Sequence, residues 1–442
     1  MQATFEQQLN SIDRQEREEA FKRLTEASAS GAITLPEQGH AFNLHCHSFF
    51  SFNGYGYSPT GLAWCGRKLG LRAMALVDFD VLDGVDEFLE TASALGLRSG
   101  AGMETRVFVP EFAEDEINSP GEPGVAYHVG IGFVSSTVKD PVLLHHLKAL
   151  AQNRTQTIIE RVNTLLHEIR LDYQQDVLSL TPNGNPTERH VCAAYDYKAR
   201  ALFPDQAALA GYWSSKLGVP VNALAKPIDS PPVLEGMIRA KTMKSGGVGY
   251  IPARGEDFPR LADVNRFILE NGAIPTFAFL DGTSSGEQRL EELLDVMVAS
   301  GVAAVNIIPD RNWNIADPET RALKVRKLGE FIQQARDRDL PILIGTEMNA
   351  YGQRLVDDFN AQELKPFVEA FEEGMFILHG HTVLERHGGR GYMSAWAKKT
   401  FKTTRDKNVF YCEVGKQAQP GIKPQLGDAD TPEALLARLT GG

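Results

Sequence analysis

The chain has 442 residues, of which 43% are hydrophobic and 23% are charged, and its formal net charge is −12. These shares are those of an ordinary globular protein, with room for an α/β barrel of about 250 residues and further segments. The acidic balance argues against a protein that binds nucleic acid through a basic face. It still allows a local basic pocket for a small anionic molecule.

The cysteines and the N-terminal residues bear on where the protein works. Four cysteines are scattered without a CxxC pair, which favours a reduced protein over a disulfide framework or a zinc finger. Residues 1–17 are polar and mixed in charge, so we expect no signal peptide. No apolar run approaches the length of a membrane span. We therefore expect a cytoplasmic protein with no membrane or nucleic-acid partner, and the oligomeric state stays open.

The predicted elements begin with an amphipathic helix over residues 4–28, and from residue 40 onward strands and helices alternate. Apolar strands of four to eight residues between helices predict a mostly parallel sheet covered by helices. The tail adds apolar stretches at 375–378 and 409–414. We expect strands at 73–77, 102–109, 127–133, 274–280, 302–308 and 342–345. The predicted segments are an N-terminal helical extension (1–39), a first barrel part (40–138), a mainly helical insertion (139–250) and a second barrel part with a C-terminal extension (251–442).

Polar residues gather near the ends of these strands, where α/β barrels place their active sites. His45 and His47 come first, and side chains at i and i+2 of a strand point to one face. Two imidazoles on one face can hold one metal ion. The other candidates along the chain are Asp78, Asp80, Glu104, His128, Arg189, His190, Glu347 and Asn349.

The order of these motifs resembles the PHP (polymerase and histidinol phosphatase) superfamily of metal-dependent phosphoesterases. Asn43-Leu44-His45-Cys46-His47-Ser48 is similar to the family's Asp-Leu-His-x-His-Ser/Thr, and Val77-Asp78-Phe79-Asp80 to its Thr-Asp-His-Asp. The resemblance covers roughly residues 40–350 and is most specific in its first hundred residues. It implies an α/β fold, a distorted TIM-like (β/α)7 barrel with a helical insertion. Later motifs are matched by Gly102-Met103-Glu104, His128-Val129-Gly130, Arg189-His190 and Gly345-Thr346-Glu347-Met348-Asn349.

The resemblance also implies two divalent metal ions, which could be Zn, Mn or Fe. The family's third ion would need ligands at Phe52, Phe79 and Asn349, whose side chains cannot hold a divalent cation, so we expect that site to be lost. The first ion would be held by His45, His47, Glu104 and Glu347. The second would share Glu104 and add His128 and His190.

The implied function is a metal-dependent hydrolase in which a hydroxide between two metals attacks a small phosphate ester. Glu104 would bridge the metals, and Asp78 or Asp80 would orient a histidine ligand. An arginine would hold the anionic substrate through its guanidinium group, and the candidates are Arg254, Arg311 and Arg390. Three tail histidines either join the site or are plain structural residues, and we favour the second interpretation for His379, His381 and His387.

Two alternatives stay open. The protein could hydrolyse a non-phosphate bond on the same scaffold, or it could be a non-catalytic PHP-like binding or regulatory protein. Convergence of the six expected ligands would favour an enzyme. His128 or Glu347 pointing away from the histidine pair would favour the non-catalytic protein.

Overall fold

The centre of the fold is one seven-stranded sheet with the strand order β1-β2-β3-β4-β5-β6-β7. A computed structural model describes residues 2–252, 254–421, 423–427 and 431–440. An isolated bridge between Cys46 and Glu347 brings the last strand back to the first, so the sheet curls into a nearly closed barrel. The expected distorted (β/α)7 barrel is confirmed. Its strands are Phe42–Cys46, Ala73–Phe79, Arg98–Phe108, Val125–Ile131, Ile274–Phe279, Ala304–Ile307 and Ile342–Ile344.

The barrel is distorted at β4, which runs antiparallel to both β3 and β5, whereas the other neighbours are parallel. The connection from β3 to β4, residues 109–124, contains a helical turn at Pro110–Phe112 but no longer helix. It lacks the helix that usually covers the crossover between two parallel strands.

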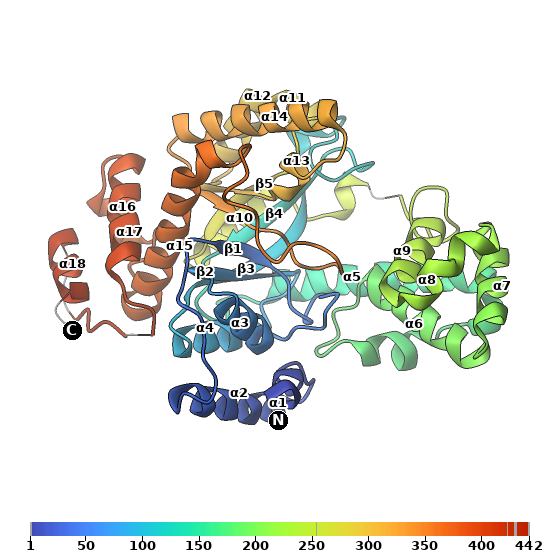
Figure 1. The fold of residues 1–442 in the computed structure, drawn as a ribbon. Coiled ribbons are helices and arrows are strands. Elements are labelled where there is room, and N and C mark those ends of the chain that lie inside the picture. The colour runs from blue at the N-terminus through green and yellow to red at the C-terminus, as the bar shows by residue number, and fades with distance from the viewer. Residues whose placement is uncertain (1, 253, 422, 428–430, 441–442) are drawn as a thin grey trace.

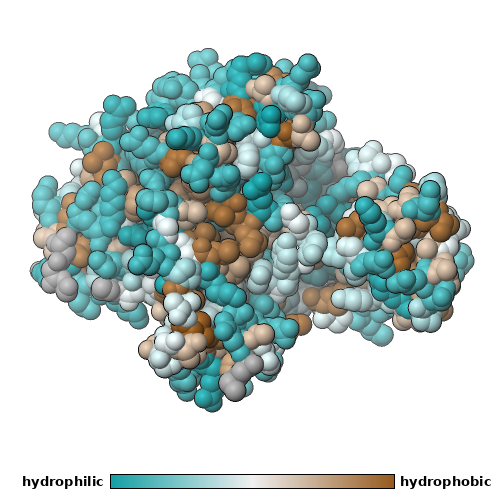
Figure 2. Space-filling model, in the orientation of Figure 1, coloured by the Kyte–Doolittle hydropathy of each residue, from teal (hydrophilic) through white to brown (hydrophobic). Residues whose placement is uncertain are grey.

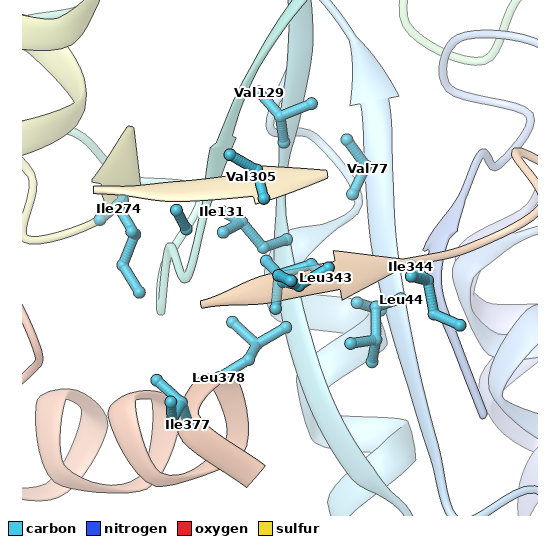
Figure 3. Close-up of a cluster of buried hydrophobic side chains, with 14 of the residues drawn as sticks. Leu44, Val77, Val129, Ile131, Ile274, Val305, Leu343, Ile344, Ile377 and Leu378 are labelled. Carbon is cyan, nitrogen blue, oxygen red and sulfur yellow. The ribbon is translucent and has the colours of Figure 1, made fainter. Parts of the chain in front are cut away.

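Aliphatic side chains fill the barrel interior, and helices cover its outside (Figure 1). Figure 3 shows Val129, Val305 and Leu343 gathered in one cluster, with Leu378 at its lower edge. Leu378 belongs to α15 (Val368–Gly388), which packs against β3 and β7. The outer helices include α3 (Pro59–Lys68), α4 (Val85–Ala94), α10 (Leu261–Glu270), α12 (Leu290–Ala299) and α14 (Pro318–Asp337).

The N-terminal segment forms two helices, α1 (Gln2–Gln8) and α2 (Arg14–Ala29), where the sequence predicts one. Asp13 begins the second helix as its N-cap, because its side chain accepts a hydrogen bond from the backbone N–H of Gln15. Arg17 of α2 then binds Glu87 of α4, with an Nε–Oε1 distance of 2.9 Å. This buried contact attaches the extension to the outside of the barrel.

The apolar stretches of the tail lie inside helices, in α15 and in α17 (Thr404–Gln417). The two helices pack closely, and small residues allow it. A Cβ atom on Gly415 would lie 1.9 Å from the carbonyl oxygen of Phe376. Four to six apolar residues do not distinguish a buried helix face from a strand, so the sequence could not decide between them.

The helical insertion leaves the barrel after β4 and returns at β5. It has its own apolar cluster, in which Tyr195 and Trp213 are fully buried. In Figure 1 it lies to one side of the barrel, in green. Its exact limits stay a prediction. Its helices are α5 (Val142–Leu165), α6 (Glu188–Leu202), α7 (Gln206–Leu217), α8 (Ala225–Asp229) and α9 (Pro231–Thr242). Within the described ranges, no helix has both the length and the apolar character needed to cross a bilayer.

Asp357, in the segment after β7, is only 4% exposed. Its Oδ1 accepts a hydrogen bond from Trp313 Nε1 at 3.0 Å, and its Oδ2 has no hydrogen-bond partner among the residues that the structure describes. Burial raises the pKa of Asp357 to about 7. In the unfolded chain the pKa would be about 3.9, so the folded state holds the proton more tightly. This contribution to stability is present below about pH 4 and is lost as the pH rises through about 7.

We therefore expect the Asp357→Asn variant to match the wild type in stability at about pH 4 and to exceed it at about pH 8. Asparagine keeps the acceptor for Trp313 and never ionises. Urea unfolding at the two pH values measures the difference. The prediction is wrong if the free energy of unfolding changes by the same amount in the variant and in the wild type between the two pH values.

Candidate metal centre

Three buried side chains meet at the carboxyl end of the barrel. His45 lies on β1, His47 follows it, and Glu104 lies on β3. The Nε2 atom of each histidine lies 3.6 Å from Oε2 of Glu104, and the three ligand atoms all lie within 4.8 Å of one another. A separation of 3.6 Å is too long for a hydrogen bond. It is close to the roughly 3.4 Å between two ligands of a tetrahedral zinc ion with bonds of about 2.1 Å.

Each of the three facing atoms is buried, and none has a hydrogen-bond partner within the described part of the chain. Such atoms are nearly always paired in folded proteins, because leaving one unpaired costs about 1–3 kcal/mol. Two imidazole nitrogens and a carboxylate oxygen are a donor set for a divalent transition metal. The cluster of His45, His47 and Glu104, called the triad below, therefore fits the expected metal.

Hydrogen bonds behind the two histidines fix which nitrogen faces the triad. Nδ1 of His45 lies 2.8 Å from Oδ1 of Asn306, which can only accept, so Nδ1 carries the proton. Nδ1 of His47 lies 3.4 Å from Oγ of Ser51, whose hydroxyl donates to Asp78. Outer contacts of this kind orient metal-binding histidines and set their tautomer. Each ring then presents the lone pair of Nε2 to the triad.

Asp78 is buried behind His47 and does not line the pocket. It accepts hydrogen bonds from the backbone N–H of Ser48 at 2.7 Å, from the Ser48 hydroxyl at 2.6 Å and from the Ser51 hydroxyl at 2.7 Å. Burial raises the pKa of Asp78 to about 6, although these bonds favour the carboxylate. Asp78 thus holds the loop that follows His47, the place expected of an orienting residue.

Charge is unevenly distributed over the two histidines. Burial, and then the neighbouring His45, lower the pKa of His47 well below its ordinary value. Burial also opposes a charge on His45, but the carboxylate of Glu104 outweighs it and raises the pKa of His45. A metal ion therefore competes with the proton that the carboxylate of Glu104 favours on His45.

Glu347 lies beside the triad, but its oxygens are paired with other groups. Oε1 accepts from Nη2 of Arg311 at 2.7 Å, and Oε2 accepts from Nδ2 of Asn349 at 3.3 Å. Its backbone has a φ of 63°, in the left-handed region, and Met348 follows at 52°. Such residues cost about 1–3 kcal/mol each and cluster at functional sites. Arg311, expected to bind substrate, is thus in the pocket as the ion-pair partner of Glu347.

His128 does not reach the triad, which corrects the expected second metal site. On the antiparallel strand β4, Val129 is paired with Glu104, so their side chains lie on the same face of the sheet. Figure 3 shows Val129 in the buried cluster inside the barrel. Neighbouring residues of a strand point to opposite faces, so His128 points outward. Its Nε2 lies 2.6 Å from Oδ1 of Asn265 on α10. Burial lowers the pKa of His128 to about 4 and keeps this ring neutral.

His190 also lies apart from the triad. Its Nδ1 accepts a hydrogen bond from the backbone N–H of Thr187 at 3.0 Å, which caps the start of α6. Its ring packs edge-on against Phe52, with centroids 5.2 Å apart. The structure therefore does not bring together the two histidines expected for a second ion.

The remaining candidates lie at different places. Asp80 lines the pocket, where its Oδ1 accepts from the Thr105 hydroxyl at 2.6 Å, and burial raises its pKa to about 6. Arg254 and Arg390 are not among the residues that line the pocket, and Arg254 is exposed.

The three tail histidines belong to α15 rather than to the pocket. His381 is fully buried between backbone groups. Its Nε2 lies 2.8 Å from the carbonyl oxygen of Gly132, and its Nδ1 accepts from the backbone N–H of Tyr392 at 2.9 Å. Nδ1 of the buried His379 accepts from the backbone N–H of Ser99 at 3.4 Å. His387 lies in the last turn of the helix.

The triad opens into a pocket of about 590 Å³ between the barrel and the insertion. Figure 2 shows the surface hollowed where these two parts meet. Phe52 and Phe79 line the pocket, and the ring of Phe79 stacks on His47 with centroids 4.2 Å apart. Asn306 was not predicted from the sequence, although a lone amide in the apolar strand Ala304–Ile307 is a usable signal. Arg154 in the insertion was not predicted either, and the sequence has no signal for it.

Comparison with known proteins gives one local match and two distant folds. No protein-family model matches the chain. It is 43% identical over 68 residues to an error-prone DNA polymerase from Cutibacterium acnes. This match covers 15% of the chain but only 6% of the polymerase, so the activity of that enzyme does not transfer. The local match is consistent with the resemblance to the PHP superfamily.

Two solved structures overlap with about three quarters of the chain. One is an amidohydrolase from Chromobacterium violaceum with bound sulfate and no metal, with 16% identity and a TM-score of 0.47 over 75% of this chain and 96% of that one. The other is described as a metal-dependent phosphoesterase from Bifidobacterium adolescentis, with 18% identity and a TM-score of 0.43 over 76% of this chain and 98% of that one. Both are too distant to assign a function.

Proposed function

We propose that the protein is a metal-dependent hydrolase of a small phosphate ester, with one divalent cation held by the triad. The observation that carries this proposal is the set of three buried ligand atoms that face one another with no hydrogen-bond partner among the described residues. His45 and Glu104 of this set line the pocket. A cation bound there would act as a Lewis acid toward the ester and its attacking water.

The surrounding residues of the pocket supply the other groups that hydrolysis needs. Asp80 lines the pocket, with one oxygen held by Thr105, and its carboxylate can accept a proton from an attacking water. Arg311 is 42% exposed as a side chain, so its guanidinium can contact both Glu347 and a phosphate oxygen. Phe79 packs on His47 and shields that ligand from water.

The competing function is a non-catalytic binding protein on the same scaffold. The observation that favours it is the outward orientation of His128, which leaves one site where the resemblance implies two. Single-metal hydrolases are common, so the loss of the second site does not exclude catalysis. Activity measurements must separate the two functions.

The experiment uses the full chain, stripped by a chelator and reloaded with Zn²⁺, Mn²⁺ or Fe²⁺ in turn. We expect about one equivalent of metal, from the triad geometry. We also expect metal-dependent hydrolysis of a phosphomonoester within a panel of phosphomonoesters, phosphodiesters and amides. Metal binding without turnover of any substrate would favour the competing function, a non-catalytic binding protein. Turnover of amides alone would establish hydrolysis of a non-phosphate bond.

The His128→Gln variant tests the single-metal assignment. Glutamine keeps a polar side chain that can hydrogen-bond to Asn265, and His128 points away from the pocket. We expect unchanged metal content by elemental analysis and an unchanged hydrolysis rate. A metal content that falls to half in the folded variant would show that the protein holds two metal ions and that His128 binds one of them.

A further inference from the structure

The wall of the pocket that faces the triad comes from the insertion and is basic. Its four cationic residues are Arg154 of α5, Arg189 of α6, Arg239 of α9 and Lys244 just beyond α9. Glu188 is the carboxylate that this wall contributes to the lining. This is a local excess of positive charge in a chain with a formal net charge of −12.

Two of the four cations share the one carboxylate. Arg239 Nε lies 2.9 Å and Lys244 Nζ lies 2.7 Å from the same Oε2 atom of Glu188. These two cations lower the pKa of Glu188 against the effect of its burial. Glu188 is therefore ionised, and its Oε2 atom already binds two of the four cations.

The other two cations have no carboxylate partner among the described residues. Both terminal nitrogens of Arg154 donate to the carbonyl oxygen of Ile251 at 3.3 Å, and the guanidinium of Arg189 lies 5.4 Å from the centroid of Phe52. The pKa of each of these two arginines is lowered, mainly by burial and next by a neighbouring arginine. That neighbour is Arg106 for Arg154 and Arg239 for Arg189. Positive charges therefore lie close together on this wall, and two of them have no carboxylate partner among the described residues.

The barrel side of the pocket has the opposite balance. Its carboxylates outnumber its cations, because Asp80, Glu104, Glu122 and Glu347 face only Arg106 and Arg311. A divalent cation at the triad would neutralise that excess, whereas the described residues of the insertion wall set only Glu188 against four cations. Guanidinium groups bind oxyanions through paired N–H donors.

We propose that this wall binds a second anionic group of the substrate, an oxyanion that is not cleaved, while the ester to be cleaved lies at the triad. This inference rests on the proposed function and names its substrate class as a phosphate ester with a second phosphate or carboxylate group. The pocket volume of about 590 Å³ suits a ligand with two such groups. Arg154 and Arg189 are the specificity-determining residues.

The test measures binding of inorganic phosphate by calorimetry to the metal-free full chain, in which the triad offers no cation. The wild type and the Glu104→Gln variant should bind phosphate with equal affinity. The double variant Arg154→Gln/Arg189→Gln should bind at least about tenfold more weakly, since each charged hydrogen bond is worth that factor or more. Arg170→Gln, which removes one exposed positive charge elsewhere in the insertion, should behave as the wild type.

Equal phosphate affinity in the wild type and the double variant would overturn the proposal, and so would no binding to the wild type. Metal content of the double variant should stay at the wild-type value, which shows that its fold and triad are intact. Phosphate binding at the wall without hydrolysis of any ester would refute the proposed function and leave this site standing. For an ester with two anionic groups, the double variant should raise KM with little change in kcat.

Discussion

The Glu104→Gln variant is expected to lose its bound metal and to hydrolyse phosphate esters about a thousandfold more slowly or worse, because it removes the only charged ligand of the triad. A neutral amide offers one weak oxygen donor, and its N–H groups would face the unpaired nitrogens of His45 and His47. The measurement is elemental analysis after purification without chelator, together with the esterase rate.

Glu111→Gln is the matched control, since Glu111 is exposed and lies outside the pocket. It should keep full metal content and rate. A Glu104→Gln protein that retained its metal would contradict the assignment of Glu104, and one that retained its rate would contradict the proposed function.

The second large effect is expected from Asp78→Ala, although Asp78 never touches the pocket. Three donors, two from Ser48 and one from Ser51, would lose their buried acceptor. We expect a loss of about 3 kcal/mol in the free energy of unfolding, because each unpaired buried group costs about 1 kcal/mol or more. Metal affinity should fall about 10–100-fold, because Ser51 no longer holds the ring of His47.

Urea unfolding gives the stability of this variant, and calorimetric titration of the metal-free protein gives its affinity. Asp78→Asn keeps one acceptor oxygen and should fall between the wild type and the alanine variant in both measurements. Unchanged metal affinity in a folded Asp78→Ala protein would show that His47 is oriented without Asp78 and Ser51.

The triad could be predicted because its members depend on local order. His45 and His47 are separated by one residue at a strand end, and Glu104 lies within the third strand, so the carboxyl ends of neighbouring strands bring them together. The barrel itself follows from the alternation of apolar strands and helices. These features need no knowledge of long-range contacts.

His128 was misplaced because the sequence does not say which face of β4 is inside. The strand reverses direction, and its register places Val129, not His128, opposite Glu104. A shift of one residue moves every side chain to the other face, so a motif match cannot fix a ligand on its own. His190 lies away from the triad for a different reason. In the folded insertion its side chain caps the start of α6 and packs against Phe52.

The basic wall could not be predicted because its residues come from separate helices of the insertion. Arg154 and Arg189 are 35 positions apart in the numbering, and the packing of α5 against α6 places both in the lining of one pocket. Asn306, which fixes the tautomer of His45, comes from a strand far along the chain. Such partners follow from tertiary structure, which local propensity does not determine.

The most direct test is anomalous diffraction from crystals of the zinc-loaded protein, with data on both sides of the zinc absorption edge. The account predicts one strong peak bonded to Nε2 of His45, Nε2 of His47 and the carboxylate of Glu104, at about 2.0–2.2 Å from each. A peak bonded to His128 or His190, or none at the triad, would contradict it.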